Sequence, residues 1–527
     1  MEKFLLNFNL LLLVIYLYKQ VRHGLHIYQL ENYYADRYAK WMRNHKDIVY
    51  EKKKLLLMGL ATVLVIVSIF YSNYYFVIGT LVLEALVLLF LIIKKKRAQE
   101  KKPFVLTARM KRMYVTYIIL IAIVFTLANL LNYKIVLACM NVAVAFGYVV
   151  AYLVSYINLP IEKRIRQGYI NKAKEKLKED KNLTVVGITG SYGKTSTKYI
   201  VNTILSQKYN TLKTPGNFNT TMGVVRTVND YLSPMHQLFL CEMGAYYPGD
   251  IKEITDLVHP KYGILTAIGP QHLDTFKSLE NVRKTKLELV DSLPDDGVAF
   301  VNWEDENIRN SKISKKTIKY GLTEEADYYA TDIDITERGS SFNVVTPKNE
   351  KIAIKTRLLG NLNILNVVAG VAVADTLGLT ADEIKVGAKY IRPVPHRLEL
   401  KQNPNGSLTI DDAYNSNIRG ATMALEVLKQ FSGRKKILIT PGIVELADKA
   451  AEINQEFGRK AAAAADFVIL VGNTQTVPIY NGLKEAKYPD GKIYMAKNLQ
   501  DALSKMNSIM TKDSVVLFEN DLPDNYL

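Results

Sequence analysis

Four long apolar segments near the start of the chain constrain its fold more than any other feature of the sequence. They are residues 55–71, 75–93, 114–131 and 135–157, and they carry almost no charge. Each is close to the roughly 20 residues that a helix needs to cross a bilayer. A fifth apolar run, residues 4–18, is shorter and contains Asn7 and Asn9. We therefore predict a multi-span α-helical membrane unit over residues 1–160, with about five spans if the first run also crosses.

Basic residues predict the orientation of these spans, because loops rich in Lys and Arg tend to stay on the cytoplasmic side. Residues 19–54 and 94–112 are strongly basic, whereas residues 72–74 and 132–134 are nearly bare of charge. With five spans, everything after residue 159 lies in the cytoplasm. If the first run does not cross, it lies along the inner face and the later domains are again cytoplasmic. The sequence thus predicts a multi-pass protein of the cell membrane whose domains after residue 159 are cytoplasmic.

The formal net charge of +17 belongs almost entirely to this first part of the chain. Residues 1–180 hold 27 Lys and Arg against 11 Asp and Glu, which leaves 41 against 40 for the rest. Topology signals and attraction to anionic lipid headgroups explain this surplus better than nucleic-acid binding does. We therefore expect the lipid bilayer, and no nucleic acid, among the partners.

Two cysteines and one acidic residue limit the kinds of site that the chain can form. Cys139 and Cys241 are the only cysteines, which excludes a disulfide framework and a cysteine-based metal site. Glu84 lies in the middle of a predicted span, where an acid is costly and often functional. Its alternative role is that of a protonated or paired acid in helix packing, and the sequence leaves both open.

The pattern changes after residue 160. A Lys-rich, helix-like stretch, residues 161–182, is interpreted as a basic amphipathic linker lying on the membrane. Short apolar or β-branched runs then alternate with helical segments, which is typical of a parallel α/β sheet. We predict a central doubly wound domain over residues 183–391 and a C-terminal Rossmann-like α/β domain over 392–527. The expected strands are residues 184–189, 237–243, 262–267, 298–302, 436–440, 467–471 and 514–518.

The first of these strands runs into a glycine-rich loop and then into a helix that is predicted over residues 197–205. Backbone N–H groups of such a loop face phosphate oxygens, and the helix N-terminus adds positive potential. Lys194 can reach the terminal phosphates, and Thr195 can hold Mg²⁺. Because Ile188 replaces the first glycine of the strict Walker pattern, the loop is a shorter variant. Its candidate ATP-binding residues are Gly190, Ser191, Tyr192, Gly193, Lys194, Thr195 and Ser196.

Further short motifs follow this loop in the order found in Mur ligases, and the chain resembles the MurF branch of that family. The resemblance covers residues 183 to about 475. The motifs are Gly190-Ser-Tyr-Gly193-Lys194-Thr195, Thr214-Pro-Gly-Asn-Phe-Asn219, Glu242-Met-Gly-Ala, Gly269-Pro-Gln-His272-Leu-Asp, Lys284-Thr-Lys286-Leu-Glu288, Gly360-Asn-Leu-Asn363-Ile-Leu-Asn366, Pro395-His-Arg397-Leu-Glu399 and Asp411-Asp412-Ala-Tyr414-Asn415-Ser-Asn417.

The resemblance implies an ATP-dependent ligase that makes amide bonds. ATP phosphorylates a carboxylate, an amino acid or dipeptide amine attacks the acyl phosphate, and phosphate leaves. In MurF enzymes the acceptor is a peptide precursor of peptidoglycan. ATP and Mg²⁺ are the implied cofactors, because the transferring phosphoryl group needs its charge neutralised.

The resemblance also assigns a metal and carbamate site. Glu242 and His272 follow apolar strands, where a parallel sheet presents ligands at its carboxyl edge, and by resemblance they bind Mg²⁺ with Thr195. Lys286 matches the lysine that Mur ligases carry as a carbamate. Lys284 lies two residues away on another face of the helix, so only one of the two can serve. The alternatives are a satisfied loop histidine for His272 and a surface lysine for Lys286.

The remaining assignments concern the nucleotide and the acceptor. Asn363 and Asn366 lie three apart on a helix and by resemblance contact the adenine, although Asn363 could instead cap the helix. Arg397 and Asp412 match residues of the C-terminal domain that close over the nucleotide. Since no single loop supplies these and Lys194, we expect domain closure. The acceptor end is expected at Asn217, Asn219, Thr220 and Thr221.

Two departures from the family leave the substrate open. The membrane unit stands where Mur ligases carry a uridine-binding domain, and Glu519-Asn520-Asp521 replaces the Lys-Gly-Ser type of ending. The acceptor is therefore either the UDP-linked MurF substrate or a lipid-linked envelope precursor. A third hypothesis, a membrane ATPase that drives regulation or transport, does not need Lys286 or the later motifs.

Overall fold

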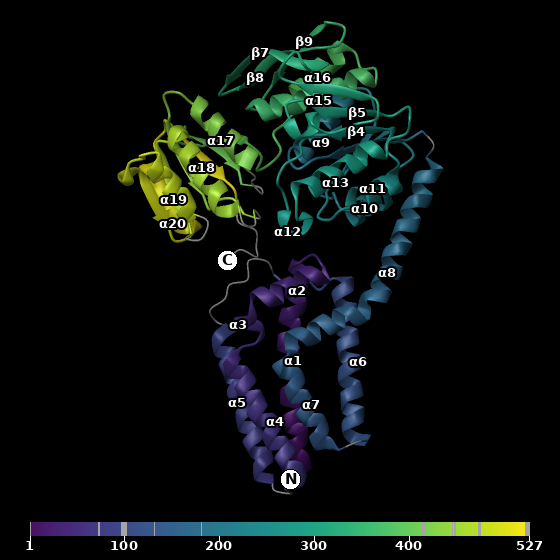
Figure 1. Ribbon diagram of the computed structural model, residues 1–527, viewed down its shortest axis with the longest axis vertical. Coiled ribbons are helices and arrows are strands. Elements are labelled where there is room, and N and C mark those ends of the chain that lie inside the picture. The colour runs from purple at the N-terminus through teal and green to yellow at the C-terminus, as the bar shows by residue number, and fades with distance from the viewer. Residues whose placement is uncertain are drawn as a thin grey trace. The chain divides into compact units, whose positions relative to one another are not determined.

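The computed structural model describes residues 2–71, 74–95, 103–130, 132–180, 182–413, 418–444, 446, 449–472 and 476–521. The chain forms two compact units, one ending at Gln167 and one beginning at Gly168. Figure 1 labels their helices and strands. Each unit is described here by itself.

The first unit is a bundle of helices whose long members coincide with the apolar runs. Apolar side chains from α1, α4, α5, α6 and α7 share one core, which includes Leu13, Met58 and Met140. Arg112 of α6 donates two hydrogen bonds to Glu162 of α8, at 2.6 and 2.9 Å, and so ties these two helices together. The helices are α1 (Glu2–Leu30), α2 (Ala35–Asn44), α3 (Lys46–Val49), α4 (Lys52–Phe70), α5 (Tyr74–Lys95), α6 (Ala108–Leu130), α7 (Tyr133–Ala145) and α8 (Gly147–Glu179).

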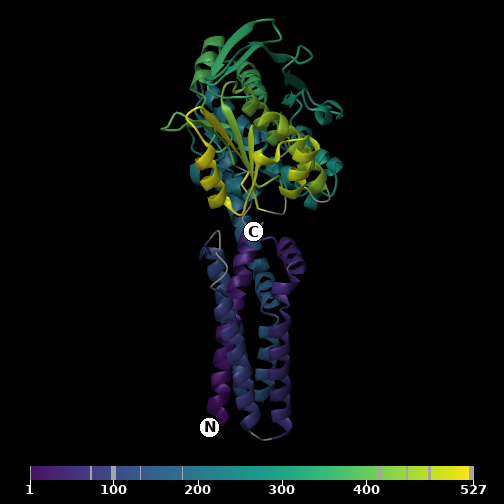
Figure 2. The same ribbon diagram turned by 90° about the vertical axis from the view of Figure 1, so that its left-hand side faces the viewer.

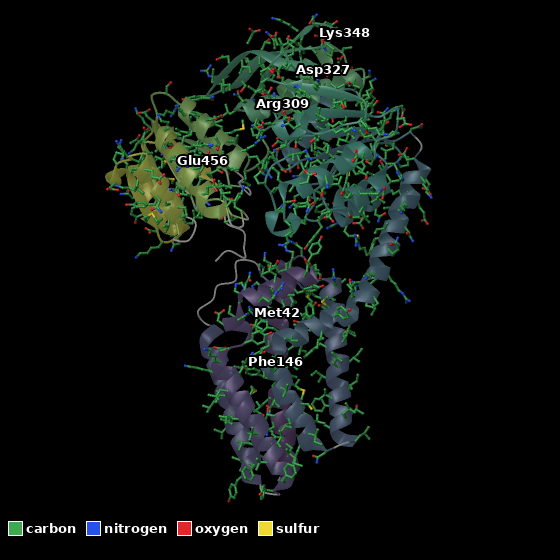
Figure 3. All side chains as sticks on the ribbon, viewed as in Figure 1. Met42, Phe146, Arg309, Asp327, Lys348 and Glu456 are labelled. Atoms are coloured by element: carbon green, nitrogen blue, oxygen red, sulfur yellow. The ribbon has the colours of Figure 1, made fainter. Side chains whose placement is uncertain are left out.

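Two stretches of helix in the described residues are long and apolar enough to cross a membrane, Lys46–Phe70 and Ala108–Ala128. A third span is possible if α7 and α8 count as one, although they meet at 93°. Phe146, the half-exposed residue at this bend, is labelled in Figure 3. The stretch Tyr75–Val87 is apolar but shorter, and the side chains of residues 88–95 lie outside the description. Glu84 is buried inside the bundle, with 3% of its surface exposed.

The predicted linker differs from the structure in one respect. Its residues belong to α8, which is helical without interruption from Gly147 to Glu179. Ala173, with Ile170 and Leu177 on the same face, packs into an apolar cluster of the central domain. Lys176 Nζ also donates to the backbone oxygen of Asn229 at 3.1 Å. This end of the helix is therefore part of the second unit and does not lie free on a surface.

The central domain is built on a nine-stranded sheet with the order β2-β3-β1-β4-β5-β6-β7-β8-β9. Strands β2 to β7 are parallel, and β8 and β9 continue the sheet antiparallel. The strands are β1 (Thr184–Thr189), β2 (Thr211–Lys213), β3 (Leu238–Glu242), β4 (Tyr262–Leu265), β5 (Val298–Asn302), β6 (Thr317–Gly321), β7 (Tyr328–Thr336), β8 (Gly339–Val345) and β9 (Lys351–Thr356).

Helices cover both faces of this sheet because its central strands are apolar on both sides. Val186 and Ile188 of β1 face a cluster that includes α9 (Lys194–Leu205), α15 (Asn361–Thr376) and α16 (Ala381–Tyr390). Val185 faces another, which includes α10 (Thr221–Tyr231), α11 (Asp250–Val258) and α13 (Leu279–Asp291). Short helices α12 (Leu273–Phe276) and α14 (Glu306–Arg309) lie in the loops after β4 and β5. The predicted doubly wound domain is thus observed.

The C-terminal domain has a six-stranded sheet with the order β10-β11-β15-β12-β13-β14, in which only the β10–β11 pair is antiparallel. Figure 2 shows helices on both faces of this sheet. Its elements are β10 (Glu399–Gln402), β11 (Leu408–Asp412), α17 (Ile418–Gln430), β12 (Lys435–Thr440), α18 (Ala450–Ala464), β13 (Phe467–Val471), α19 (Thr476–Glu485), β14 (Ile493–Ala496), α20 (Leu499–Ile509) and β15 (Ser514–Glu519).

All seven predicted strands exist, with ends shifted by at most two residues, as in β4, which ends at Leu265. The helix after the phosphate loop begins earlier than predicted, at Lys194. The antiparallel strands β8 and β9 were not predicted. β9 alternates exposed and buried residues along Lys351–Thr356, the pattern of a strand with one face in solvent.

The packing of α8 on the central domain can be tested with a matched pair of variants. Ala173→Glu places a charge in a fully buried apolar site and should cost on the order of 3 kcal/mol locally. Lys174→Glu changes an exposed neighbour and should have little effect. Limited proteolysis of the full chain should therefore cut residues 168–180 faster in the first variant only. Equal cleavage of both would contradict the observed packing.

Candidate functional site

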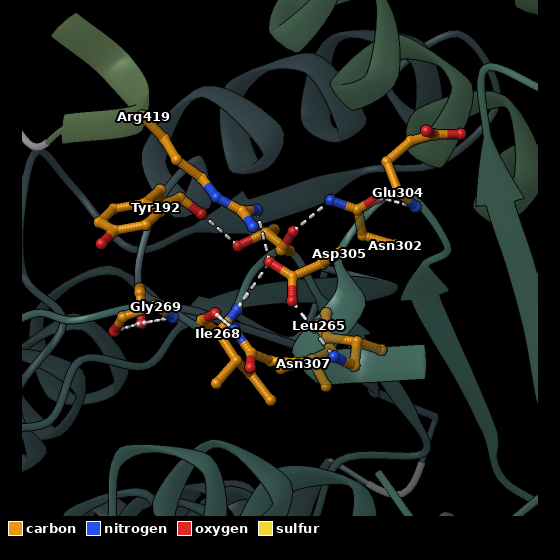
Figure 4. Close-up of polar contacts among 12 residues, drawn as sticks. Tyr192, Leu265, Ile268, Gly269, Asn302, Glu304, Asp305, Asn307 and Arg419 are labelled. Carbon is orange, nitrogen blue, oxygen red and sulfur yellow. Dashed lines mark hydrogen bonds and ion pairs between the residues drawn. The ribbon is translucent and has the colours of Figure 1, made fainter. Parts of the chain in front are cut away.

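The phosphate loop is held against the segment that follows β4. Gly190 has a φ of +150°, and a Cβ there would lie 2.1 Å from Thr266 Oγ1, so only glycine fits. Ser191 Oγ donates to the backbone oxygen of Gly269 at 3.0 Å and accepts from its N–H at 3.0 Å. The Tyr192 hydroxyl donates to the backbone oxygen of Pro270 at 2.9 Å. Hydrogen bonds thus join two of the predicted motifs, part of which is drawn in Figure 4.

Lys194 begins α9, directly after Gly193, whose φ of +81° turns the chain into the helix. Its Nζ donates to the backbone oxygen of Gly190 at 2.6 Å, so the ammonium group is folded back over the loop. Burial lowers the pKa of Lys194 to about 8 against the opposing effect of Glu242, and the charge of Arg397 lowers it by a smaller amount. An anion bound on the loop would stabilise the charged form of Lys194. Thr195 and Ser196 follow it in the first turn of α9, and both are partly exposed.

Glu242 ends β3 with 1% of its surface exposed, yet both carboxylate oxygens are engaged. Oε1 accepts from the Thr195 hydroxyl and from Asn219 Nδ2, each at 3.1 Å. Oε2 forms a 2.8 Å ion pair with Nζ of the fully buried Lys198. Burial alone would raise the pKa of Glu242, but Lys198 and Lys194 outweigh it and hold that pKa below its ordinary value. The carboxylate is therefore kept ionised.

Lys198 is a residue of this site that the sequence reasoning missed. A signal was available, since Lys198 lies four residues after Lys194 and so on the same face of α9. Its partner Glu242 is 44 positions away in the chain, and no local pattern links the two.

Thr195 and Glu242 fit a magnesium ion. Their Oγ1 and Oε1 atoms are 3.1 Å apart, near the roughly 2.9 Å that separates adjacent oxygen ligands of octahedral Mg²⁺. Magnesium usually takes only one or two protein ligands, with phosphate and water completing its shell. The described residues accordingly hold no group of three or more His, Cys, Asp and Glu with metal-site geometry.

His272, the other candidate metal ligand, lies in the loop after β4 with a left-handed φ of 50°. Its ring lies 4.5 Å from the ring of Tyr246, and its backbone oxygen accepts from Thr275 N at 2.9 Å. The side chains of Leu273 and Asp274 in the same motif lie outside the description. The geometry is compatible with both sequence interpretations of His272.

Lys286 and Lys284 differ sharply on α13. Lys286 is 2% exposed, whereas the Lys284 side chain is 72% exposed and lies 3.8 Å from Glu280. Burial, with the nearby charge of Lys194, holds the pKa of Lys286 well below its ordinary range. The alternative of a surface lysine is therefore wrong for Lys286. Carbon dioxide reacts with the neutral form of an amine to give a carbamate. A buried lysine that favours its neutral form therefore suits this modification.

The two candidate adenine contacts are both buried on α15. Asn366 Oδ1 accepts from the Thr197 hydroxyl at 3.0 Å, while its Nδ2 has no partner among the described residues. Asn363 Nδ2 donates to the backbone oxygen of Leu359 at 2.9 Å. The N-cap of α15 is Gly360, so the interpretation of Asn363 as the cap is wrong.

The predicted acceptor residues fall into two groups. Asn217 is exposed in the loop before α10, and Asn219 donates to Glu242 as described. Thr220 caps α10 by accepting from Gly223 N at 3.3 Å, and the Thr221 hydroxyl donates to Glu253 Oε2 at 2.5 Å. The hydroxyls of the two threonines thus have structural partners, and Asn219 is the acceptor candidate that contacts a metal candidate, Glu242.

The C-terminal candidates gather at the end of β11. Burial raises the pKa of Asp412 to about 6, against the hydrogen bond from Leu398 N and the charge of Arg397. Glu519, the register partner of Asp412 on β15, is fully buried beside it. Arg397 is close enough to influence the pKa of Lys194, so the structure brings both domains to the phosphate loop. Residues 414–417 of the same motif lie outside the described residues.

A further contact between these domains was not predicted. Arg419 of α17 forms a 2.6 Å ion pair with Asp305, whose side chain is fully buried after β5 (Figure 4). Asp305 also accepts from the backbone N–H groups of Ile268 and Ile308, at 3.2 and 3.1 Å. The C-terminal domain is thereby linked to the loop that carries the Gly269 motif.

Two family descriptions match the second unit. The Mur ligase middle domain matches residues 188–374, and the Mur ligase glutamate ligase domain matches residues 396–519. Neither covers residues 1–187.

The chain is also similar to several complete enzymes that share one name. The UDP-N-acetylmuramoyl-tripeptide–D-alanyl-D-alanine ligase of Escherichia coli K12 is 34% identical over 293 residues, which are 55% of this chain and 64% of the relative. The Bacillus subtilis enzyme is 28% identical over 64% of this chain and 72% of its own. The chain thus spans less than two thirds of the length of the Escherichia coli relative.

Solved structures agree with the sequence comparison. MurF from Acinetobacter baumannii superposes with a TM-score of 0.62 at 26% identity, over 68% of this chain and 78% of that protein. MurF from Thermotoga maritima, solved with ADP, gives 0.61 at 26% identity over 68% and 81%.

The lowered pKa of Lys194 predicts how nucleotide affinity depends on pH. Phosphate beside the ammonium raises its pKa, so binding takes up a proton above about pH 8, and affinity falls up to roughly tenfold per pH unit from there towards pH 10. Calorimetry with Mg·ADP between about pH 7 and 10 measures both effects. Lys194→Arg keeps its charge and should lose this dependence. An unchanged dependence in that variant would contradict the assignment.

Proposed function

Because the chain belongs to the Mur ligase family, we propose that it is a MurF-like, ATP-dependent acid–amino-acid ligase. It joins an amine to the carboxylate of a cell-envelope peptide precursor during peptidoglycan synthesis. The proposal rests on one observation. The phosphate loop, the Thr195–Glu242 pair and the buried Lys286 lie together at one edge of the central sheet.

The proposed reaction has two steps. An oxygen of the acceptor carboxylate attacks the γ-phosphorus of ATP, the bond to the β-phosphate oxygen breaks, and ADP leaves. The amine nitrogen then attacks the acyl carbon, loses a proton, and expels phosphate as the amide forms. Loop N–H groups and Lys194 hold the phosphates in line, and magnesium held by Thr195 and Glu242 supplies charge neutralisation.

We propose that Lys286 carries a carbamate. Two buried ammonium groups close together repel each other, as the effect of Lys194 on the pKa of Lys286 indicates. A carbamate turns one of these cations into an anion, so repulsion becomes attraction. It also adds oxygen atoms to the donor set of Thr195, Glu242 and His272.

The C-terminal domain contributes Arg397 and Asp412 to the same nucleotide. Arg397 is placed to contact phosphate, and Asp412 to contact the ribose or the metal. Asn363 and Asn366 hold the adenine. The buried Nδ2 of Asn366, which has no partner within the part of the chain that the structure describes, supports a role in binding. Closure of the two domains over ATP would hold these groups on the nucleotide.

The acceptor is proposed to be a UDP-linked muramoyl peptide and the amine D-alanyl-D-alanine, as the description of the Escherichia coli relative states for that enzyme. The helical unit favours a second candidate, a lipid-linked envelope precursor. Residues 1–187 match neither family domain, and an anchored enzyme would meet lipid-linked substrate at a raised local concentration.

We propose that the helical unit spans the cell membrane with the second unit in the cytoplasm. α4 exposes large apolar side chains, among them Leu56 at 65% and Val63 at 55%, which water would penalise and lipid would not. The basic residues of 19–54 and 94–112 orient the unit.

The reaction is tested with the full-length protein in membranes. ATP with UDP-muramoyl-tripeptide and D-alanyl-D-alanine should release phosphate only when both substrates are present. Lys194→Ala should lower the rate by at least about 100-fold, because a phosphoryl-binding cation is lost. Release with a lipid-linked acceptor and the amine, but not with the UDP-linked acceptor, would identify the second candidate. Release without any acceptor would favour a membrane ATPase and refute the ligase.

The carbamate is tested with two lysine variants. In protein equilibrated with ¹³C-bicarbonate, NMR should detect a carbamate carbon in the wild type and in Lys284→Ala, and no such signal in Lys286→Ala. Only Lys286→Ala should lose activity, by about 100-fold or more. A signal that persists in Lys286→Ala would contradict the assignment.

The topology is tested by protease access. Proteinase added outside intact spheroplasts should leave residues 168–521 uncut, whereas inverted membrane vesicles should expose them. Release of the protein from membranes by an alkaline carbonate wash would contradict spanning.

A further inference from the structure

Lys198 is a fully buried cation to which the proposed reaction gives no role. Its Nζ lies 2.8 Å from Glu242 Oε2 and donates to the backbone oxygen of Gly216 at 2.7 Å. It also lies 5.2 Å from the centre of the Tyr199 ring. One ammonium group is thus shared between the candidate metal-binding carboxylate and a loop carbonyl.

The loop in question, residues 214–219, leads into the predicted acceptor site. It is tied to the end of β3 by several bonds. The N–H of Glu242 donates to Thr214 Oγ1 at 3.2 Å, and that of Gly244 to the Asn219 backbone oxygen at 2.6 Å. Asn219 Nδ2 shares Glu242 Oε1 with Thr195. At Gly216, in the middle of the loop, Lys198 supplies the bond to the carbonyl.

The two carboxylate oxygens of Glu242 have different partners. With Oε2 bound to Lys198, Oε1 is the oxygen directed at Thr195, where magnesium fits. A divalent cation at Oε1 withdraws charge from the whole carboxylate and repels the nearby ammonium. The ion pair between Lys198 and Oε2 then weakens, and the hydrogen bond from Lys198 to the Gly216 carbonyl gains in strength.

We propose that Lys198 is a positioning residue that couples the metal site to the acceptor loop, so that magnesium binding at Glu242 orders residues 214–219. This inference rests on the proposed function, because it takes Glu242 as a metal ligand. It adds a coupling, in which the loop is tightened when Mg-nucleotide binds. By linkage, a bound acceptor then raises the affinity for magnesium by the same factor.

Backbone hydrogen exchange of the full-length protein tests the coupling without any acceptor or amine. With ADP and magnesium, the wild-type peptide covering residues 214–219 should exchange at least about five-fold more slowly than with ADP and a chelator. In Lys198→Met the loop should exchange quickly, and magnesium should no longer change its rate. Lys198→Arg, which keeps a charge and several donors, should restore part of the response.

Lys213→Met is the matched control. Lys213 Nζ also lies 5.2 Å from the Tyr199 ring, but it has no contact with Glu242, so its removal should leave the magnesium response intact. Thermal unfolding of each variant checks folding. If Lys198→Met does not fold, the wild type and Lys198→Arg carry the test.

Two results would overturn the proposal: a wild-type loop that exchanges equally with and without magnesium, or a full response in Lys198→Met. Because no acceptor is present, a wrong substrate under the proposed function would leave these results unchanged. That failure would appear only in the phosphate-release assay.

Discussion

A single ionised carboxylate, buried where β3 ends, is the constraint on which the rest of the site depends. Glu242 cannot be left alone at 1% exposure, because an isolated buried charge is very costly. The domain surrounds it with three donors from two segments: Thr195 and Lys198 from α9, and Asn219 from the loop before α10. These contacts fix the phosphate loop and the acceptor loop relative to each other, so the chemistry has a defined geometry.

The same region contains the side chains of Lys194, Lys198 and Lys286. Lys194 and Lys286 both have lowered pKa values, each because of burial and a nearby cation. Such an arrangement is stabilised by anions, and nucleotide phosphates and a carbamate are the anions that the proposed chemistry provides. Nucleotide binding and the proposed catalysis therefore depend on the same electrostatic interactions. The ion pair between Arg419 and Asp305 brings the C-terminal domain to the same edge of the central sheet.

Local patterns in the sequence predicted many strands and residues of the site. They could not predict contacts between residues far apart in the chain. The apolar β1, the glycines of the phosphate loop and Glu242 at the end of β3 were all found, because each is encoded by neighbouring residues. The pairing of Lys198 with Glu242 was missed because it joins distant segments. β9 was missed although its alternation was visible, and the continuation of α8 into the central domain depends on packing that no periodicity reveals.

The central claim is that ATP activates a carboxylate at this site, and isotope transfer tests it most directly. Acceptor peptide labelled with ¹⁸O in its carboxylate is incubated with the full-length protein, ATP, magnesium and the amine, and the released phosphate is analysed by mass spectrometry. The account predicts one ¹⁸O atom in each phosphate, since the carboxylate oxygen leaves with it. Unlabelled phosphate would mean that water, not the acceptor, attacks ATP, and would contradict the account.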